Sequence, residues 1–142
     1  MDTITHGLAG YVVAKTGLTR DTGRWGVIAG VAAAVFPDVD NLLGAFYGPE
    51  FTVRSHPGLT NSLILVIPFS FFFAWLSAKI SRKNRFWTFF LIWVVEILIH
   101  TFLDLITSFG TMILSPLSSH RFALDWVFII DLCLTGIFLI AS

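Results

Sequence analysis

The stretch FWTFFLIWVVEILIHTFLDLI, from Phe86 to Ile106, decides the fold. It is long enough to cross a bilayer, which needs about 20 mostly apolar residues. Glu96, His100 and Asp104 interrupt it at intervals of four, so they share one face of a helix. A charged side chain in hydrocarbon costs at least about 2.5–3.5 kcal/mol, so this face must line the interior of a bundle. The stretch therefore predicts a membrane helix whose polar face points at other helices.

The composition of the whole chain indicates the same class. Of its 142 residues, 56% are hydrophobic and only 13% are charged, whereas a soluble domain carries about 25% charged residues. Together with the length, this predicts one all-α integral membrane domain over residues 1–142. The net charge is zero and there is no large basic cluster, so nucleic acid is excluded as a partner. The single cysteine cannot form an internal disulfide.

Four further apolar stretches complete the predicted bundle. Two are long enough to be full spans, from about Leu59 to Ile80 and from about Phe122 to Ala141. Two are shorter, from about Thr5 to Lys15 and from about Trp25 to Phe36, and each would extend under roughly 20 Å as a straight helix. We therefore expect three full spans preceded by an N-terminal pair of short helices.

Gly26 and Gly30 form a G-x-x-x-G pair in the second short stretch. Small residues let membrane helices approach closely. The pair predicts close packing inside the bundle, and the alternative is the seam of an oligomer.

Basic residues predict the orientation of the chain in the membrane. If the chain zigzags, two of its connections lie on one side, and they hold seven of the nine Lys and Arg residues: Lys15, Arg20, Arg24, Lys79, Arg82, Lys83 and Arg85. Cytoplasmic loops carry such an excess of positive charge. We expect this basic side to be cytoplasmic, and the N-terminus and the loops over residues 41–58 and 109–121 to be extracytoplasmic.

The other side gathers the residues that can bind a cation. All four histidines fall on or near it, together with five acidic residues: Asp2, Asp38, Asp40, Glu50 and Asp104. The excess of negative charge on the 86–106 helix favours a divalent metal ion. A buried network in which His100 bridges Glu96 and Asp104 is the alternative. Asp131 lies near mid-membrane, where it would accept a hydrogen bond or orient a ligand histidine.

The Pro37–Asp40 sequence follows the second short helix. Taken alone, Pro-Asp-Val-Asp is typical of a turn, because proline breaks helices and aspartate favours turns. Its place level with His100 and Asp104 favours metal ligation instead.

Five short motifs lie in order along nearly the whole chain. They are M-D-x-x-T-H-G-L-x-G at residues 1–10, P-D-V-D at 37–40, H-P-G-L-T-N-S at 56–62, H-x-x-x-D-x-x-T-x-x-G at 100–110, and a late group of Pro116, Arg121, Phe122, Asp125 and Asp131. In this order they resemble the YdjM-type family of bacterial inner-membrane, metal-dependent hydrolases. The combination makes the resemblance specific, because each motif alone is short.

The resemblance implies a chemistry and a ligand set. It implies a distant relation to zinc-dependent phospholipase C and hydrolysis of a phosphoester, in a lipid or another membrane-associated substrate. Zinc is the metal it favours, with manganese or magnesium as alternatives and with two or more ions. Clustered divalent ions activate water and stabilise displacement on phosphorus. The chain departs from the family pattern at Pro57, where the family has arginine, and at Asn61, where it has histidine, a better zinc ligand than an amide.

Candidate roles follow from the motifs. Asp38 and Glu96 are the candidate catalytic carboxylates. The candidate metal ligands are His6, Asp40, Asn61, His100 and Asp104. Residues expected to orient ligands or contact substrate are Asp2, His56, Thr60, Thr107 and Asp131.

We predict a membrane-embedded, metal-dependent phosphoesterase of the bacterial inner membrane, with its site facing the extracytoplasmic side. The expected substrate is a membrane lipid or a lipid-linked phosphate. Asn61 supports an alternative, a catalytically degenerate binding or regulatory protein on the same scaffold. The polar stripe of the 86–106 helix supports another, a small ion or proton transporter.

Overall fold

The fold is known from a computed structural model, which describes residues 2–39, 59–108, 110–118, 120–127 and 132–142. Over these residues it contains five α-helices and no strand, which confirms the predicted all-α fold. The α-helices are α1 (Thr3–Val13), α2 (Arg24–Val35), α5 (Leu63–Ser81), α6 (Phe86–Leu105) and α7 (Leu132–Ala141). A π-helical turn, η1 (Ala14–Leu18), and two 3-10 turns, η2 (Phe36–Asp38) and η3 (Leu59–Asn61), flank them.

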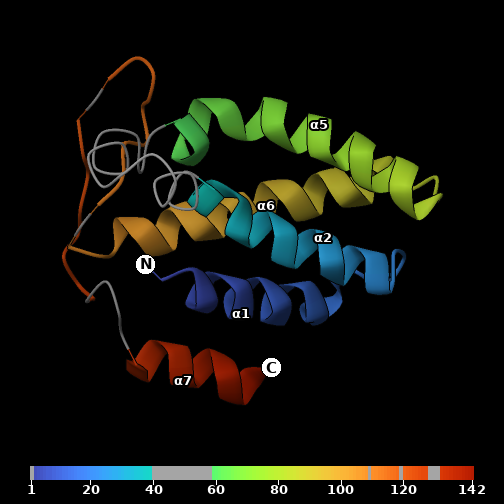
Figure 1. The fold of residues 1–142 in the computed structure, drawn as a ribbon, viewed down its shortest axis with the longest axis horizontal. Helices are drawn as coiled ribbons and strands as arrows, with labels where there is room; N and C mark the ends of the chain where they lie inside the picture. Colours follow the sequence, from blue (N-terminus) through green and yellow to red (C-terminus); the bar gives the residue numbers. More distant parts are fainter. Residues whose placement is uncertain (1, 40–58, 109, 119, 128–131) are drawn as a thin grey trace.

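The helices pack both on their neighbours in the chain and on helices distant in sequence. α1 packs on α2 and α5 on α6, while α2 also packs on α6 and α7 on α1 (Figure 1). The main apolar core lies between α2, α5 and α6, and its largest fully buried side chains are Phe89, Ile92 and Ile97. All three belong to α6, which makes that helix the centre of the bundle.

Two of the three predicted spans are present as helices. α5 and α6 have 19 and 20 residues, and both are long and apolar enough to cross a membrane. Ser62 begins α5 by accepting a hydrogen bond from the backbone N–H of Ile64. Arg82 ends it in the left-handed conformation, with φ of 54°.

The prediction of a third span over Phe122–Ala141 is wrong for its first residues, since Phe122 to Val127 are not helical. The backbone N–H groups of Leu124, Trp126 and Val127 instead donate to the carbonyl oxygens of residues 105 and 106, at distances of 2.8–3.1 Å. The last carbonyls of a helix have no partner within it. This segment satisfies those of α6, and among the described residues of the predicted span only the ten of α7 are helical.

The two basic connections lie together at one end of the bundle, as the zigzag predicts. Lys83 donates a hydrogen bond from Nζ to the carbonyl oxygen of Thr22, at 2.9 Å. Arg85 lies 3.9 Å from the carboxylate of Asp21. The start of α1 lies at the opposite end (Figure 1).

The short α1–α2 pair also agrees with the prediction, and the structure places its G-x-x-x-G glycines. Gly26 and Gly30 are buried. A Cβ on Gly26 would lie 2.1 Å from the hydroxyl oxygen of Thr22, and one on Gly30 would lie 3.0 Å from Cβ of Ala14. Both glycines therefore allow close contact within the chain itself.

Candidate metal centre

Four side chains from three elements meet at the end of the bundle opposite the basic connections. His6 comes from α1, Asp38 from η2, and His100 and Asp104 from α6. One ligand atom from each lies within 4.8 Å of the ligand atoms of the others, and all four residues are buried. We call these four residues the metal cluster.

Local sequence explains how each member reaches the cluster. Pro37 stands where α2 gives way to the 3-10 turn η2, and Asp38 is buried in that turn, directly after the end of α2. His100 and Asp104 lie one turn apart on α6 and share its buried face. His6 follows the start of α1, where Asp2 is the N-cap.

The distances in the metal cluster fit ligands around one ion. Asp104 Oδ1 lies 3.1 Å from His6 Nε2, and Asp104 Oδ2 lies 3.3 Å from His100 Nε2. His100 Nε2 lies 3.8 Å from Asp38 Oδ1. Zinc binds nitrogen and oxygen at about 2.0–2.2 Å, so two ligands in a tetrahedron are about 3.3–3.6 Å apart. The observed separations lie around that range.

The His100 imidazole is oriented for ligation. His100 Nδ1 donates to the carbonyl oxygen of Ala34 at 2.6 Å, so Nε2 presents its lone pair to the metal cluster. The rings of His6 and His100 are stacked, with centroids 3.7 Å apart. The neutral imidazole is the form that binds metals.

Charge and hydrogen bonding both show that the residues present fit a divalent cation. Two carboxylates and two neutral imidazoles give a formal charge of about −2 inside the bundle, which a dication would neutralise. Within the described part of the chain, the buried atoms without a hydrogen-bond partner include three that belong to the metal cluster or lie beside it: His6 Nδ1, His100 Nε2 and Asn61 Oδ1. Such atoms are costly unless something satisfies them.

Neighbouring polar residues bond to the Asp104 carboxylate and to the backbone beside both aspartates. Asn61 is fully buried, and its Nδ2 donates to Asp104 Oδ2 at 3.4 Å. The Thr107 hydroxyl donates to the carbonyl oxygen of Asp104 at 2.7 Å. The Thr60 hydroxyl donates to the carbonyl oxygen of Pro37, next to Asp38, at 2.9 Å. The sequence predicted Asn61 as a metal ligand, and Thr60 and Thr107 as residues that orient ligands or contact substrate. The structure places all three beside the metal cluster, and their roles stay predictions.

Thr3 is a neighbour of the metal cluster that the sequence analysis missed. Its hydroxyl donates to Asp38 Oδ2 at 2.8 Å. Thr3 lies three residues before His6, on the same face of α1. That spacing was the one available signal, and it is weak in a helix of ordinary composition.

Glu96 is buried but does not belong to the metal cluster. Its carboxylate lies where α1 and α2 meet α6. A Cβ on Gly10 would lie 3.4 Å from Oε2, and one on Gly30 would lie 3.3 Å from Oε1. The shared face of Glu96, His100 and Asp104 is confirmed, whereas a catalytic role for Glu96 stays a prediction.

Asp2 has a structural position rather than a place among the ligand atoms. Its carboxylate accepts hydrogen bonds from the backbone N–H and the hydroxyl of Thr5, at 2.9 and 2.7 Å. Burial alone would raise the pKa of Asp2, but these hydrogen bonds outweigh it and lower the pKa. The other predicted site residues, Asp40, His56 and Asp131, lie outside the described residues.

Comparison with known proteins gives one family. A family model described as YdjM inner membrane protein matches residues 1–142, which is the whole chain. No curated protein and no solved structure matches it. The metal cluster therefore has to be interpreted from its own geometry.

Proposed function

Because the chain belongs to the YdjM inner membrane protein family, we propose that it is a metal-dependent hydrolase of the inner membrane, acting on a phosphoester in a lipid or a lipid-linked substrate. The observation that carries the proposal is the buried metal cluster of two histidines and two aspartates. Ionisable residues within the membrane region of a bundle are rare and mark functional sites. Here four ionisable residues from three elements form one buried group, and packing of the helices alone does not require such a group.

In the proposed site, His6, His100 and Asp104 hold the ion; two imidazoles and one carboxylate suit zinc and leave a fourth position for water. A divalent ion there would supply a Lewis acid and lower the pKa of a bound water. Asp104 is the central ligand, because it contacts both histidines. The prediction of two or more ions rests on the family resemblance and on Asp40 as a further ligand.

Asp38 is the proposed proton acceptor. One of its oxygens accepts the hydrogen bond from Thr3, while the other is directed toward His100. Thr3 therefore fixes the orientation of the carboxylate. A general base has to be within hydrogen-bond reach of the proton it takes, and this orientation meets that condition for a water inside the metal cluster.

The chain is proposed to cross the membrane several times, with the basic connections in the cytoplasm and the metal cluster toward the extracytoplasmic side. Lys15 lies 4.6 Å from the ring of Tyr11, and Lys79 lies 4.9 Å from the ring of Trp75. Lysines and aromatic rings of this kind gather at membrane interfaces. The excess of basic residues at this end supports a cytoplasmic location.

Asn61 supports a second candidate function, a binding or regulatory protein on a degenerate hydrolase scaffold. Its amide donates a hydrogen bond to Asp104, whereas a histidine there could offer a nitrogen lone pair to the ion. The metal cluster would then bind an ion without turning over a substrate.

Metal analysis tests whether the cluster is a metal centre. We would measure bound metals by elemental mass spectrometry on detergent-purified wild type, His100→Ala, Asn61→His and the matched control His120→Ala, since His120 is exposed. We expect near-stoichiometric zinc or manganese in wild type and His120→Ala, and a loss of at least tenfold in His100→Ala. Equal metal contents in His100→Ala and wild type would overturn the assignment.

Cleavage of a phosphoester tests the reaction. Wild type and Asn61→His would be incubated with phospholipids, with the water-soluble headgroup product measured, and with polyprenyl phosphates, with inorganic phosphate measured; we expect Asn61→His to be the faster enzyme. If both proteins hold metal and neither forms either product, the degenerate-scaffold function replaces the hydrolase.

A further inference from the structure

A segment of unusual exposure crosses the end of the bundle next to the metal cluster. We call its described residues, 111–118 and 120–127, the crossing segment; it runs past the ends of the helices on the side where α1 begins (Figure 1). Residues 111–118 carry no charged side chain. Leu117 is 84% exposed and Trp126 is 72% exposed, and Leu114 and Leu124 are exposed as well.

This exposure does not come from a loosely attached backbone. Thr111 and Phe122 pair through two backbone hydrogen bonds, at 2.9 and 3.0 Å. The N–H of Leu124 donates to the carbonyl oxygen of Leu105 at 2.8 Å. The side chains of Thr111 and Met112 are buried, so the same segment has both an inner and an outer side. Its apolar outer side is therefore held in place by its own inner contacts.

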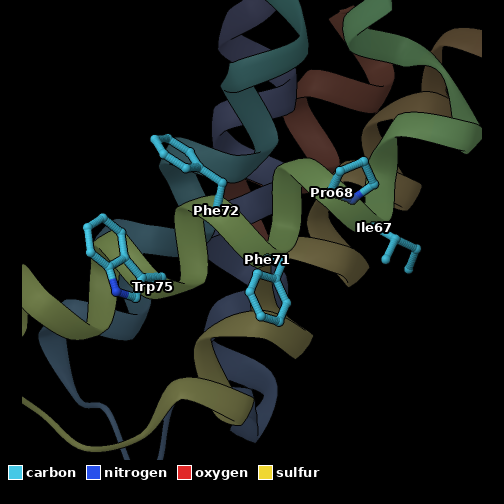
Figure 2. Close-up of a pocket in the computed structure, with 5 residues that line it drawn as sticks. All are labelled: Ile67, Pro68, Phe71, Phe72 and Trp75. Atoms are coloured by element: carbon cyan, nitrogen blue, oxygen red, sulfur yellow. The ribbon is translucent and has the colours of Figure 1, made fainter.

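The outer side of the crossing segment is continuous with the exposed apolar side of α5. The N–H of Leu63 donates to the carbonyl oxygen of Ile113 at 3.0 Å, and the Ser62 hydroxyl donates to the carbonyl oxygen of Ser115. From this junction, exposed apolar residues continue along α5 through Ile64 and Ile67. They lead to a shallow apolar groove of about 470 Å³ (Figure 2), lined by Ile67, Pro68, Phe71, Phe72 and Trp75.

The crossing segment is also connected to the metal cluster through Thr107 and through the start of α5. Val127 forms an isolated bridge with Thr107, and the Thr107 hydroxyl bonds to the backbone of Asp104. Asn61, which bonds to Asp104, immediately precedes the N-cap of α5. One residue, Thr107 or Asn61, therefore stands between Asp104 and the segments that carry the exposed apolar residues.

We propose that the crossing segment is embedded in the lipid leaflet at this end of the bundle, with Leu117 and Trp126 as its anchors, and that the metal cluster thereby faces lipid headgroups. Tryptophan favours the headgroup level of a bilayer, and exposed leucine favours the region just below it. A segment with apolar anchors and few charges fits a lipid surface better than bulk water. Naming a lipid headgroup as substrate rests on the proposed hydrolase function, whereas the membrane contact itself does not.

Spin labels test the membrane contact. Single cysteines would replace Leu117 or, as the matched control, the exposed Asn84 between α5 and α6, in a Cys133→Ser background. The labelled proteins would be placed in vesicles of phosphatidylethanolamine and phosphatidylglycerol. We expect the label at 117 to be more accessible to oxygen than to a water-soluble nickel chelate, and the label at 84 to show the reverse. High nickel accessibility at 117 would place it in water, and low accessibility to both reagents would mean a protein cover; either result overturns the proposal.

Hydrolysis tests the consequence for the substrate. Leu117→Glu and the conservative Leu117→Met would be compared on phospholipid vesicles and on a short-chain, water-soluble phosphoester. We expect Leu117→Glu to lose at least tenfold activity on vesicles only, and Leu117→Met to retain it. Equal losses on both substrates, or no loss on either, would overturn the role of the anchor. A wild type that hydrolyses neither substrate would overturn the hydrolase function, while the spin labels would still decide the membrane contact.

Discussion

α5 and α6 are neighbours of almost the same length and hydropathy, yet the bundle uses them in opposite ways. In the most apolar stretch of α5, 17% of the residues are buried. In the corresponding stretch of α6, the buried share is 44%. α6 contributes the largest buried side chains of the core and half of the metal cluster. α5 directs Phe71, Phe72 and Trp75 outward, around the groove on its outer face (Figure 2).

The difference shows what hydropathy measures and what it does not. Hydropathy identifies both helices as compatible with a membrane, because each consists mainly of large apolar residues. It does not say which one is central. Glu96, His100 and Asp104 identify α6 as the central helix, because three ionisable groups on one face exclude that face from lipid. In α5, the buried face carries only the small or neutral residues Val66, Ser70 and Ala74.

The largest effect is expected from removing the same side chain on the two helices. Phe89 on α6 is fully buried, whereas Phe72 on α5 is 55% exposed. Phe89→Ala leaves a cavity and is expected to cost about 3–5 kcal/mol of unfolding free energy. Phe72→Ala is expected to cost under about 1 kcal/mol, because lipid or detergent fills the space. Unfolding of both variants in detergent would measure the difference, and equal losses would contradict the central position of α6.

The polar face of α6 can be tested without changing its volume. Asp104→Asn removes the carboxylate that contacts both His6 and His100. We expect metal affinity to fall at least about 100-fold, which is the upper range for perturbing residues that only support ligands. Asp125→Asn is the matched control, because Asp125 is exposed and its φ of 55° suits asparagine. Metal competition titrations would compare the two, and a similar affinity in both variants would remove Asp104 from the site.

Much of this arrangement was predictable from the sequence because the signals were local. The two long helices follow from apolar length, and the shared polar face follows from the spacing of four. His6, Asp38, His100 and Asp104 were all among the predicted site residues, and the structure brings them within reach of one ion. Their convergence was predictable because a zigzag chain returns the start of α1 and the end of α2 to the end of α6.

What could not be predicted depends on contacts between distant segments. Residues 122–127 are apolar enough for a helix, but their N–H groups satisfy the end of α6 instead. Glu96 shares a face with His100, yet its carboxylate lies against Gly10 of α1 and Gly30 of α2 and not among the ligand atoms. Neither outcome leaves a periodic signal in the sequence, because each depends on which backbone lies opposite.

A smaller effect is expected from adding one methyl group where α1 and α2 meet α6. A Cβ on Gly10 would lie 2.5 Å from Cβ of Ala34 and 3.1 Å from the carbonyl oxygen of Gly30. Gly10→Ala is therefore expected to cost about 1–3 kcal/mol through overpacking, seen as a lower melting temperature. Gly136→Ala on α7 is the matched control, because a Cβ there meets nothing within 4 Å. A Gly10→Ala protein as stable as this control would show that the close approach of α1 and α2 is not needed.

The smallest effect concerns Asp2, which lies outside both membrane helices and caps the helix that carries His6. The pKa of Asp2 is lower in the folded protein than in the unfolded chain, where it is about 4. The charge of Asp2 therefore stabilises the fold above the unfolded pKa. That stabilisation is lost as the pH falls through the lower, folded-state pKa. Asp2→Asn keeps a capping side chain without a titrating charge. We expect wild type to exceed Asp2→Asn in stability by up to about 1 kcal/mol at pH 6, and the difference to shrink as the pH falls below about 4. Thermal unfolding of both proteins across this range would measure it. A difference that did not change with pH would mean that the hydrogen bonds to Thr5, rather than the charge of Asp2, hold the start of α1 and with it His6.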